Sequence, residues 1–116
     1  MRSSTRALGT EAEKRVRLYY LLRGYRVLAA NARAGGNELD VVVRRGRRVV
    51  FVEVKARSGE RFGDPLEAGG PEKARRLRRA AEGFLARNPE LLELEISFEV
   101  AAVRKGRIDR VQLQSS

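Results

Sequence analysis

The chain has 116 residues, 42% of them hydrophobic, which is typical of one compact domain, and we expect a single domain over residues 1–116. It contains no cysteine and no histidine, which excludes disulfides, a Ser-His-Asp triad and a zinc site of the usual Cys/His kind. Any acid–base or metal chemistry must therefore use carboxylates and lysine, and such oxygen ligands favour magnesium, manganese or calcium.

The formal net charge is +10, from 25 lysine and arginine residues against 15 aspartate and glutamate residues. A balance this basic favours nucleic acid as a partner, because cations that neutralise phosphates supply most non-specific affinity. The alternative is that the cations, mostly arginine, are scattered over a solvated surface. The sequence has no long apolar run and no secretory signal pattern, so we expect a cytoplasmic protein without a membrane association.

The segment TEAEKRVRLYYLLRG predicts a helix over roughly residues 11–23 that ends at Gly24. Thr10 and Glu13 have the spacing of a capping box at its start. Its expected buried stripe consists of Ala12, Val16, Tyr19 and Tyr20. A helical turn of 100° per residue aligns Glu11 with Leu18 and Leu22, and we expect this line to lie beside the buried stripe rather than opposite it.

Three strands are predicted next. YRVLAAN indicates a strand over Tyr25–Ala30 that ends in a small glycine-containing turn. The stretch GGNELDVVVRRGRRVVFVEVKAR predicts a hairpin of about Glu38–Val43 and Arg48–Ala56, turned at Arg45 and Gly46. A glycine-rich loop follows from Ser58 to Gly70.

The rest of the chain predicts one helix and two strands. EKARRLRRAAEGFLARN forms a helix that stops before Asn88-Pro89, with a buried stripe of Leu77, Ala80, Ala81, Phe84 and Leu85. LELEISFEVAAV alternates as a strand, turns at residues 104–106 and returns as RIDRVQL. The element order α-β-β-β-α-β-β predicts an α/β fold with a mixed central sheet flanked by helices.

The hairpin carries four charged groups among its valines. Because strand side chains alternate between faces, Glu38 and Asp40 share one face, and Glu53 and Lys55 share one with Val49 and Phe51. A two-residue turn at Arg45 and Gly46 would pair residues whose numbers sum to 91, such as Val42 with Val49 and Asp40 with Phe51. All four charges then project from one end of one face. The opposite face is nearly all apolar, with Leu39, Val41, Val43, Val50, Val52 and Val54.

Two interpretations of these charges remain open from the residues alone. They can form ordinary surface ion pairs, worth about 0.2 to 1 kcal/mol each. Alternatively, three carboxylates gathered on a mostly covered face repel one another by roughly 4 kcal/mol per close pair at an effective dielectric of 20, which calls for a compensating cation. Lys55 supplies one positive charge, and a divalent metal ion would supply two.

Asp40, twelve further residues and then Glu53-Val54-Lys55 resemble the motif of the PD-(D/E)XK nuclease superfamily, whose core is α-β-β-β-α-β. More broadly, GTEAEKRVRLYYLLRGYRVLAANARAGGNELD, VVFVEVKAR and RFGDPLEAGGPEKARRLRRAAEGFL resemble the small bacterial YraN-like family over almost the whole chain. That family is similar to archaeal Holliday-junction resolvases. The resemblance implies a restriction-endonuclease-like fold and a role in DNA repair or recombination.

The resemblance also implies roles for particular residues. Asp40 and Glu53, with the main-chain carbonyl of Val54, would hold a magnesium or manganese ion. Lys55 would orient the attacking water and stabilise charge on the phosphate. Glu11 matches an additional acidic residue of the resolvase-like branch, and Glu38 would bind the metal through water or brace the site.

Three positions depart from the family pattern. Asn37 stands where the family usually has a glycine before Glu38, and Leu39 replaces the proline of the superfamily motif. Late in the chain, Ser97-Phe98-Glu99 replaces the family's usual Arg-Phe-Asp. Asp40, Glu53 and Lys55 are all retained.

We expect nucleic-acid contacts at Arg57, Arg61 and Phe62, by the loop after the motif strand, with a flexible crossover as the alternative. We also expect them at Lys73 and Arg76 on the second helix, with a solvated face as the alternative. The expected activity is a magnesium- or manganese-dependent endonuclease acting on branched or flapped DNA rather than RNA, recognised by shape and backbone. A homodimer is expected by analogy with resolvases. The alternatives are a nucleic-acid-binding protein that does not cut, and a basic protein-interaction module.

Overall fold

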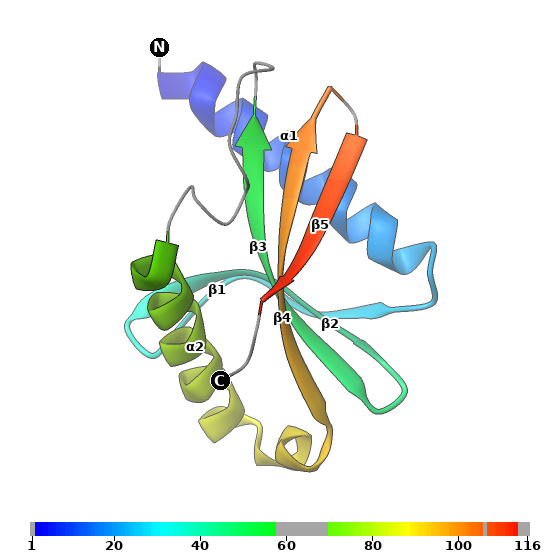
Figure 1. The fold of residues 1–116 in the computed structure, drawn as a ribbon, viewed down its shortest axis with the longest axis vertical. Coiled ribbons are helices and arrows are strands. Elements are labelled where there is room, and N and C mark those ends of the chain that lie inside the picture. Colours follow the sequence, from blue (N-terminus) through cyan, green and yellow to red (C-terminus); the bar gives the residue numbers. More distant parts are fainter. Residues whose placement is uncertain (1, 58–69, 106, 114–116) are drawn as a thin grey trace.

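The computed structural model describes residues 2–57, 70–105 and 107–113, and these form an α/β fold (Figure 1). The elements in chain order are α1 Arg2–Leu21, β1 Arg26–Ala34, β2 Asn37–Arg45, β3 Arg48–Arg57, α2 Gly70–Arg87, the 3₁₀ helix η2 Pro89–Glu93, β4 Glu95–Arg104 and β5 Arg107–Leu113. The predicted order of helices and strands is confirmed, and η2 is an addition to it.

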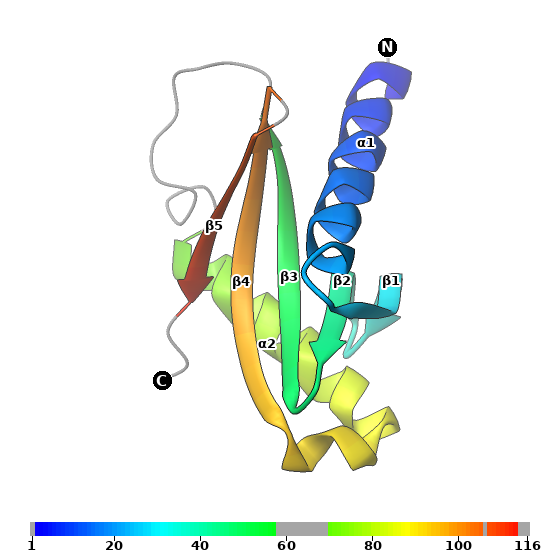
Figure 2. The same cartoon turned by 90° about the vertical axis from the view of Figure 1, so that its right-hand side faces the viewer.

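The five strands form one mixed sheet in the order β1-β2-β3-β4-β5. Neighbouring strands are antiparallel except for β3 and β4, which are parallel and are joined through α2. Figure 2 shows the strands side by side with α2 running behind β3 and β4, and in Figure 1 α1 crosses behind β3, β4 and β5 while α2 lies to their left. The expectation of a mixed sheet flanked by helices is confirmed.

Each helix covers one hydrophobic cluster, because alternate residues of β3 point to opposite faces. The α1 cluster joins Ala12, Val16 and Tyr20 to Val50 and Val52. The α2 cluster joins Leu77, Ala80 and Ala81 to Val49 and Phe51. β3 is therefore covered on both faces, as expected for a central strand.

Helix α1 begins well before the predicted start, since it runs from Arg2 and contains Thr10 in its interior. The capping box expected at Thr10 and Glu13 is therefore wrong. The predicted end is confirmed: Gly24 has a φ of +88°, its amide donates to Leu21 O, and the amide of Tyr25 donates to Tyr20 O. These two bonds form a Schellman motif, for which glycine is the favoured residue.

The turn between β2 and β3 consists of Gly46 and Arg47, not of Arg45 and Gly46 as predicted. Arg45 pairs with Arg48, and Val42 pairs with Phe51. Gly46 has a φ of +60°, which suits its place as the first turn residue. Every pair is shifted by two residues from the prediction, so the side chains keep their predicted faces.

One apolar side chain departs from its predicted face. Leu39 was expected beside Val41 and Val43, but it packs in the α2 cluster while those two valines lie in the α1 cluster. Figure 1 shows that β2 bends midway, so that its first half runs across the direction of β3. The bend rotates the start of β2 under α2, and strict alternation along the strand is lost there.

Two glycines bring α2 against the β1–β2 turn. A Cβ on Gly83 of α2 would lie 2.4 Å from the Gly35 amide nitrogen, and a Cβ on Gly35 would lie 2.3 Å from Arg79 O. Glycine at both positions lets the helix and the turn touch backbone to backbone. This contact sets the height of α2 over the start of β2.

Glu99 is the one charged residue among the described residues that is buried, at 4% exposure. It accepts a hydrogen bond from the Tyr20 hydroxyl and another from Arg110 at 3.1 Å, and its other oxygen lies 3.8 Å from Arg48. Glu99 therefore joins α1, β3, β4 and β5 on the α1 face, away from the motif residues.

Neither described helix combines the length and apolarity that a bilayer crossing requires.

Candidate active site

Asp40 lies where β2 parts from β3. The backbone pairs of these two strands run from Arg45–Arg48 to Val41–Val52, and Asp40 is one residue beyond the last pair. Its Oδ2 accepts a hydrogen bond from the Val54 amide at 2.9 Å. Where the backbone pairing ends, this side-chain hydrogen bond therefore continues the contact between the two strands and holds Asp40 against β3, next to Glu53.

Among the residues that line the cleft, Asp40 has the pKa that departs most from its usual value. Burial raises its pKa to about 6, and the hydrogen bond from the Val54 amide acts in the opposite direction. The negative charges of Glu53, Glu13 and Glu38 raise the pKa further. A half-buried carboxyl surrounded by three others is a site that favours a positive charge.

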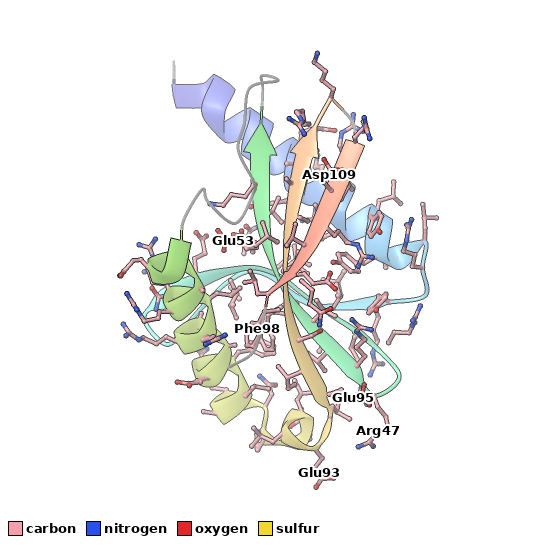
Figure 3. The ribbon with its side chains drawn as sticks, viewed as in Figure 1. Arg47, Glu53, Glu93, Glu95, Phe98 and Asp109 are labelled. Carbon is pink, nitrogen blue, oxygen red and sulfur yellow. The ribbon has the colours of Figure 1, made fainter. Side chains whose placement is uncertain are left out.

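Glu53 and Lys55 lie two residues apart on the α2 side of β3, and Figure 3 labels Glu53 on that side. Lys55 Nζ is 3.7 Å from Glu53 Oε2, and both side chains are mostly buried, with 14% and 16% exposure. The two side chains therefore form an ion pair in a partly dry site. The predicted convergence of these charges at one end of a covered face is confirmed.

An open cleft of about 300 Å³ lies between β2, β3 and α2, and its described lining consists of Asn37, Glu38, Asp40, Glu53, Arg76 and Leu77. Three carboxylates form one wall. Arg76, an exposed residue of α2, contributes its guanidinium to the opposite wall of the cleft. A phosphate entering the cleft would therefore meet an arginine on one side and the acidic cluster on the other.

The carboxylate that α1 directs toward Asp40 is Glu13. Its charge contributes to the raised pKa of Asp40, and its side chain is half-buried. Glu11, predicted for this role, is exposed. Its line on the helix also contains Leu18 and Leu22, which are 55% and 75% exposed, so this line is the outward side of α1 and not the flank of the buried stripe.

The remaining predicted residues fall in different places. Val54 donates its amide to Asp40, and the metal contact predicted for its carbonyl stays a prediction. Arg57 ends β3 and Lys73 lies in the first turn of α2, but the side chains of both are outside the described residues. Arg61 and Phe62 lie wholly outside them. Arg76 is the predicted nucleic-acid contact that the structure brings into the cleft.

The donor set suits a divalent metal ion held with help from substrate and water. Among the described residues, no three acidic side chains meet closely enough to hold an ion by themselves. Asp40 and Glu53 offer two carboxylates, and the repulsion that raises the pKa of Asp40 would be relieved by a bound cation. Magnesium commonly binds through one or two carboxylates, with waters and phosphates completing its shell. The residues therefore fit such an ion.

Sequence reasoning missed Glu13 as the α1 carboxylate whose charge acts on Asp40, and Asn37 as a cleft residue. Glu13 follows Ala12 directly and lies one turn before Val16 and Arg17, so a helical wheel centred on the buried Ala12, Val16 and Tyr20 would have placed it at the flank of the core. Asn37 was noticed only as a departure from the family pattern. It lines the cleft and donates its side-chain amide to Gly35 O at 3.0 Å, which steadies the entry into β2.

Residues 12–112 match the model of a family described as Uncharacterised protein family UPF0102. A UPF0102 protein of Synechococcus sp. is 41% identical over 105 residues, which span 90% of this chain and 80% of the relative. One from Parvibaculum lavamentivorans is 45% identical, with 83% and 71% covered. One from Mycolicibacterium vanbaalenii is 48% identical, with 72% and 69% covered.

Proposed function

The chain belongs to the UPF0102 family, and from that membership together with the geometry of its cleft we propose that it is a divalent-metal-dependent endonuclease that hydrolyses phosphodiester bonds in branched or flapped DNA. The observation that carries this proposal is the meeting of Asp40, Glu53 and Lys55 where β2 parts from β3. The element order and the parallel pairing of β3 with β4 support a restriction-endonuclease-like core of the PD-(D/E)XK superfamily.

Asp40 and Glu53 would hold the metal ion, with the carbonyl of Val54 as a third ligand. When bound there, magnesium or manganese supplies a Lewis acid for the phosphate and lowers the pKa of a coordinated water. The Val54 amide keeps Asp40 in one orientation, so that its outer oxygen is presented to the cleft. Preorganised ligands of this kind lose little entropy when the ion enters.

Lys55 and Arg76 act on the phosphate. Lys55 Nζ, which Glu53 holds at 3.7 Å, orients the attacking water and offsets the negative charge that grows on the phosphate oxygens. Arg76 approaches from α2 and binds a non-bridging oxygen through its planar guanidinium. Glu38 extends the acidic wall and contributes to the charge that attracts the ion.

The direct test uses purified protein on a four-way junction, a flap, single-stranded DNA, duplex DNA and RNA, with manganese or magnesium against EDTA. We expect metal-dependent cleavage of the branched or flapped DNA. Asp40→Asn and Lys55→Ala should each lower the rate by about 100-fold or more. Glu90→Gln and Lys14→Ala are matched controls, because they remove the same charges from exposed positions.

The other outcomes separate the rival functions. Binding that weakens steeply with salt, without cleavage of any substrate, would replace the nuclease by a binding protein. If no nucleic acid binds in a salt-sensitive way, the basic surface serves another protein. Cutting two strands of a junction requires two active sites, so we also propose a homodimer, which light scattering on the DNA-bound protein would test.

A further inference from the structure

Three cations gather at the turn between β4 and β5, on the opposite side of β3 from β2. Arg104, Lys105, Arg107 and Asp109 form the described lining of an open pocket of about 250 Å³. Arg104 Nη2 lies 3.5 Å from Asp109 Oδ2, and both side chains remain well exposed, at 35% and 45%. The pocket therefore presents three positive charges against one negative charge.

The local structure concentrates positive charge at this end of the sheet. Arg104 and Arg107 are direct cross-strand partners, and like charges placed opposite each other destabilise a hairpin. Lys105 has a φ of +51°, in the left-handed region where glycine, asparagine and aspartate are the usual residues. A phosphate beside the two guanidinium groups would add to the compensation that Asp109 gives Arg104.

The turn lies on the same face of the sheet as the candidate active site. Lys55 pairs with Ala102, and Ala102 pairs with Asp109. Arg104 is two residues beyond Ala102 and pairs with Arg107, so both arginines occupy positions on the face that carries Lys55. Figure 3 labels Glu53 and Asp109 in the same half of the sheet.

The spacing suits one continuous nucleic-acid strand. Two residues along a strand and one or two strands across give Cα separations of roughly 8 Å from Lys55 to Arg104 and roughly 12 Å to Arg107. Successive nucleotides of one strand rise about 3.4 Å along a duplex axis, and because the strand winds around that axis its neighbouring phosphates lie about twice as far apart. The two arginines are therefore about one to two nucleotides away from a phosphate held at Lys55.

We infer that Arg104, Lys105 and Arg107 bind backbone phosphates of the nucleic acid that occupies the cleft, about one to two nucleotides from the phosphate at Lys55. The inference rests on the proposed function for its ligand but not for cleavage. An extended phosphate track across β3, β4 and β5 would fix the direction in which the substrate crosses the sheet. It would also recognise backbone without reading base sequence.

The test measures binding rather than cutting. A labelled four-way junction and a matched duplex are titrated with the Asp40→Asn protein in EDTA, at several salt concentrations between 50 and 200 mM. Introducing Arg104→Gln with Arg107→Gln should weaken binding about tenfold and lower the slope of log K against log salt by about 2, since each phosphate contact contributes about 0.9. The pair Lys14→Gln and Arg15→Gln, exposed on α1 across the sheet, is the matched control.

Replacing single phosphates by neutral methylphosphonate groups locates the contact. Methylphosphonate substitutions along one strand should weaken the parent protein at one or two adjacent positions, and the Arg104→Gln, Arg107→Gln protein should no longer respond there. Arg76→Gln should instead lose its response at a different phosphate, about one to two nucleotides away. Arg104→Lys with Arg107→Lys keeps the charge and should restore most of the salt slope, which excludes a loss caused by misfolding.

The outcomes distinguish this inference from the proposed function. Binding and salt slope equal to those of the control pair would overturn the phosphate track, even if the wild-type protein cleaves DNA. A wild-type protein that binds no nucleic acid would overturn it as well. A reduced slope in a protein that never cleaves would support the track and reject the nuclease.

Discussion

The Asp40 carboxylate accepts a hydrogen bond from the Val54 amide at 2.9 Å, one residue beyond the last backbone pair of β2 and β3. A side chain thereby holds together two strands at the point where they part. The same contact keeps a half-buried carboxyl next to Glu53, Glu13 and Glu38, whose charges oppose its ionisation. Under the proposed function, stability and metal binding would therefore be coupled at this residue.

The first prediction concerns pH and stability without metal. The pKa of Asp40 is raised from 3.8 to about 6, so the folded protein holds this proton more tightly than the unfolded chain. Asp40 should therefore lower stability as the pH rises from about 4 to about 6, by about 2 kcal/mol once solvent in the cleft is allowed for. Asp40→Asn should remove this loss.

Urea unfolding in EDTA measures this effect. Asp40→Asn should be more stable than wild type by about 2 kcal/mol at pH 8, and the difference should fall toward zero at pH 4. Glu11→Gln, on the exposed side of α1, should show no such dependence. An Asp40→Asn protein that is less stable than wild type at pH 8 would mean that the carboxylate is already compensated in the free protein.

The second prediction distinguishes Glu13 from Glu11, two carboxylates of α1. Glu13 acts on Asp40, whereas Glu11 is exposed on the outward side. Glu13→Gln should weaken manganese binding by roughly three- to tenfold, because it removes one nearby negative charge. Glu11→Gln should leave it unchanged. Isothermal titration with manganese checks both, and the reverse ranking would restore Glu11 as the acidic residue of the site.

The third prediction concerns the buried Glu99. It accepts hydrogen bonds from Tyr20 and Arg110. Burial, together with the hydrogen bond to Glu99, keeps the pKa of Tyr20 above its usual range. Glu99→Ala should cost about 3 to 5 kcal/mol of unfolding free energy, because it leaves buried polar groups without their acceptor. Tyr20→Phe should cost about 1.5 to 3 kcal/mol.

Tyr19→Phe is the control for that series, since the ring of Tyr19 keeps its contact with the Arg23 guanidinium, 3.5 Å from the ring centre. It should change stability by less than about 0.5 kcal/mol. Chemical denaturation of all three proteins gives the comparison. Equal losses for Tyr19→Phe and Tyr20→Phe would assign no special weight to the Tyr20–Glu99 bond.

The fourth prediction concerns the glycine contact between α2 and the β1–β2 turn. Gly83→Ala improves helix propensity but puts a Cβ 2.4 Å from the Gly35 nitrogen, so it should still destabilise the protein, by about 1 to 3 kcal/mol. Displacement of α2 should also move Arg76 away from the cleft and weaken DNA binding. Gly36→Ala, with no atom within 4 Å of its Cβ, should cost about 1 kcal/mol without changing DNA affinity.

Thermal melts and DNA titrations of the two alanine variants test this coupling. If Gly83→Ala and Gly36→Ala lowered DNA affinity equally, the height of α2 over β2 would have no part in the cleft. An unchanged melting temperature for Gly83→Ala would show that α2 can shift at no cost.

The amino-acid sequence by itself determined the order of elements and the faces of β3. Alternation over Val49, Phe51, Glu53 and Lys55 is a local property of extended backbone, so it survived the error of two residues in the hairpin register. The end of α1 at Gly24 was equally readable, since the left-handed residue of a Schellman motif is usually glycine.

Only the tertiary structure decided which residues complete the site. The choice of Glu13 over Glu11 depends on which side of α1 packs against β3, and apolar residues lie on both sides because Leu18 and Leu22 are exposed. The bend that turns Leu39 toward α2 lies close to the point where Gly35 and Gly83 bring α2 against the β1–β2 turn. Long-range packing sets these features, and the local spacing of residues in the sequence gives no information about that packing.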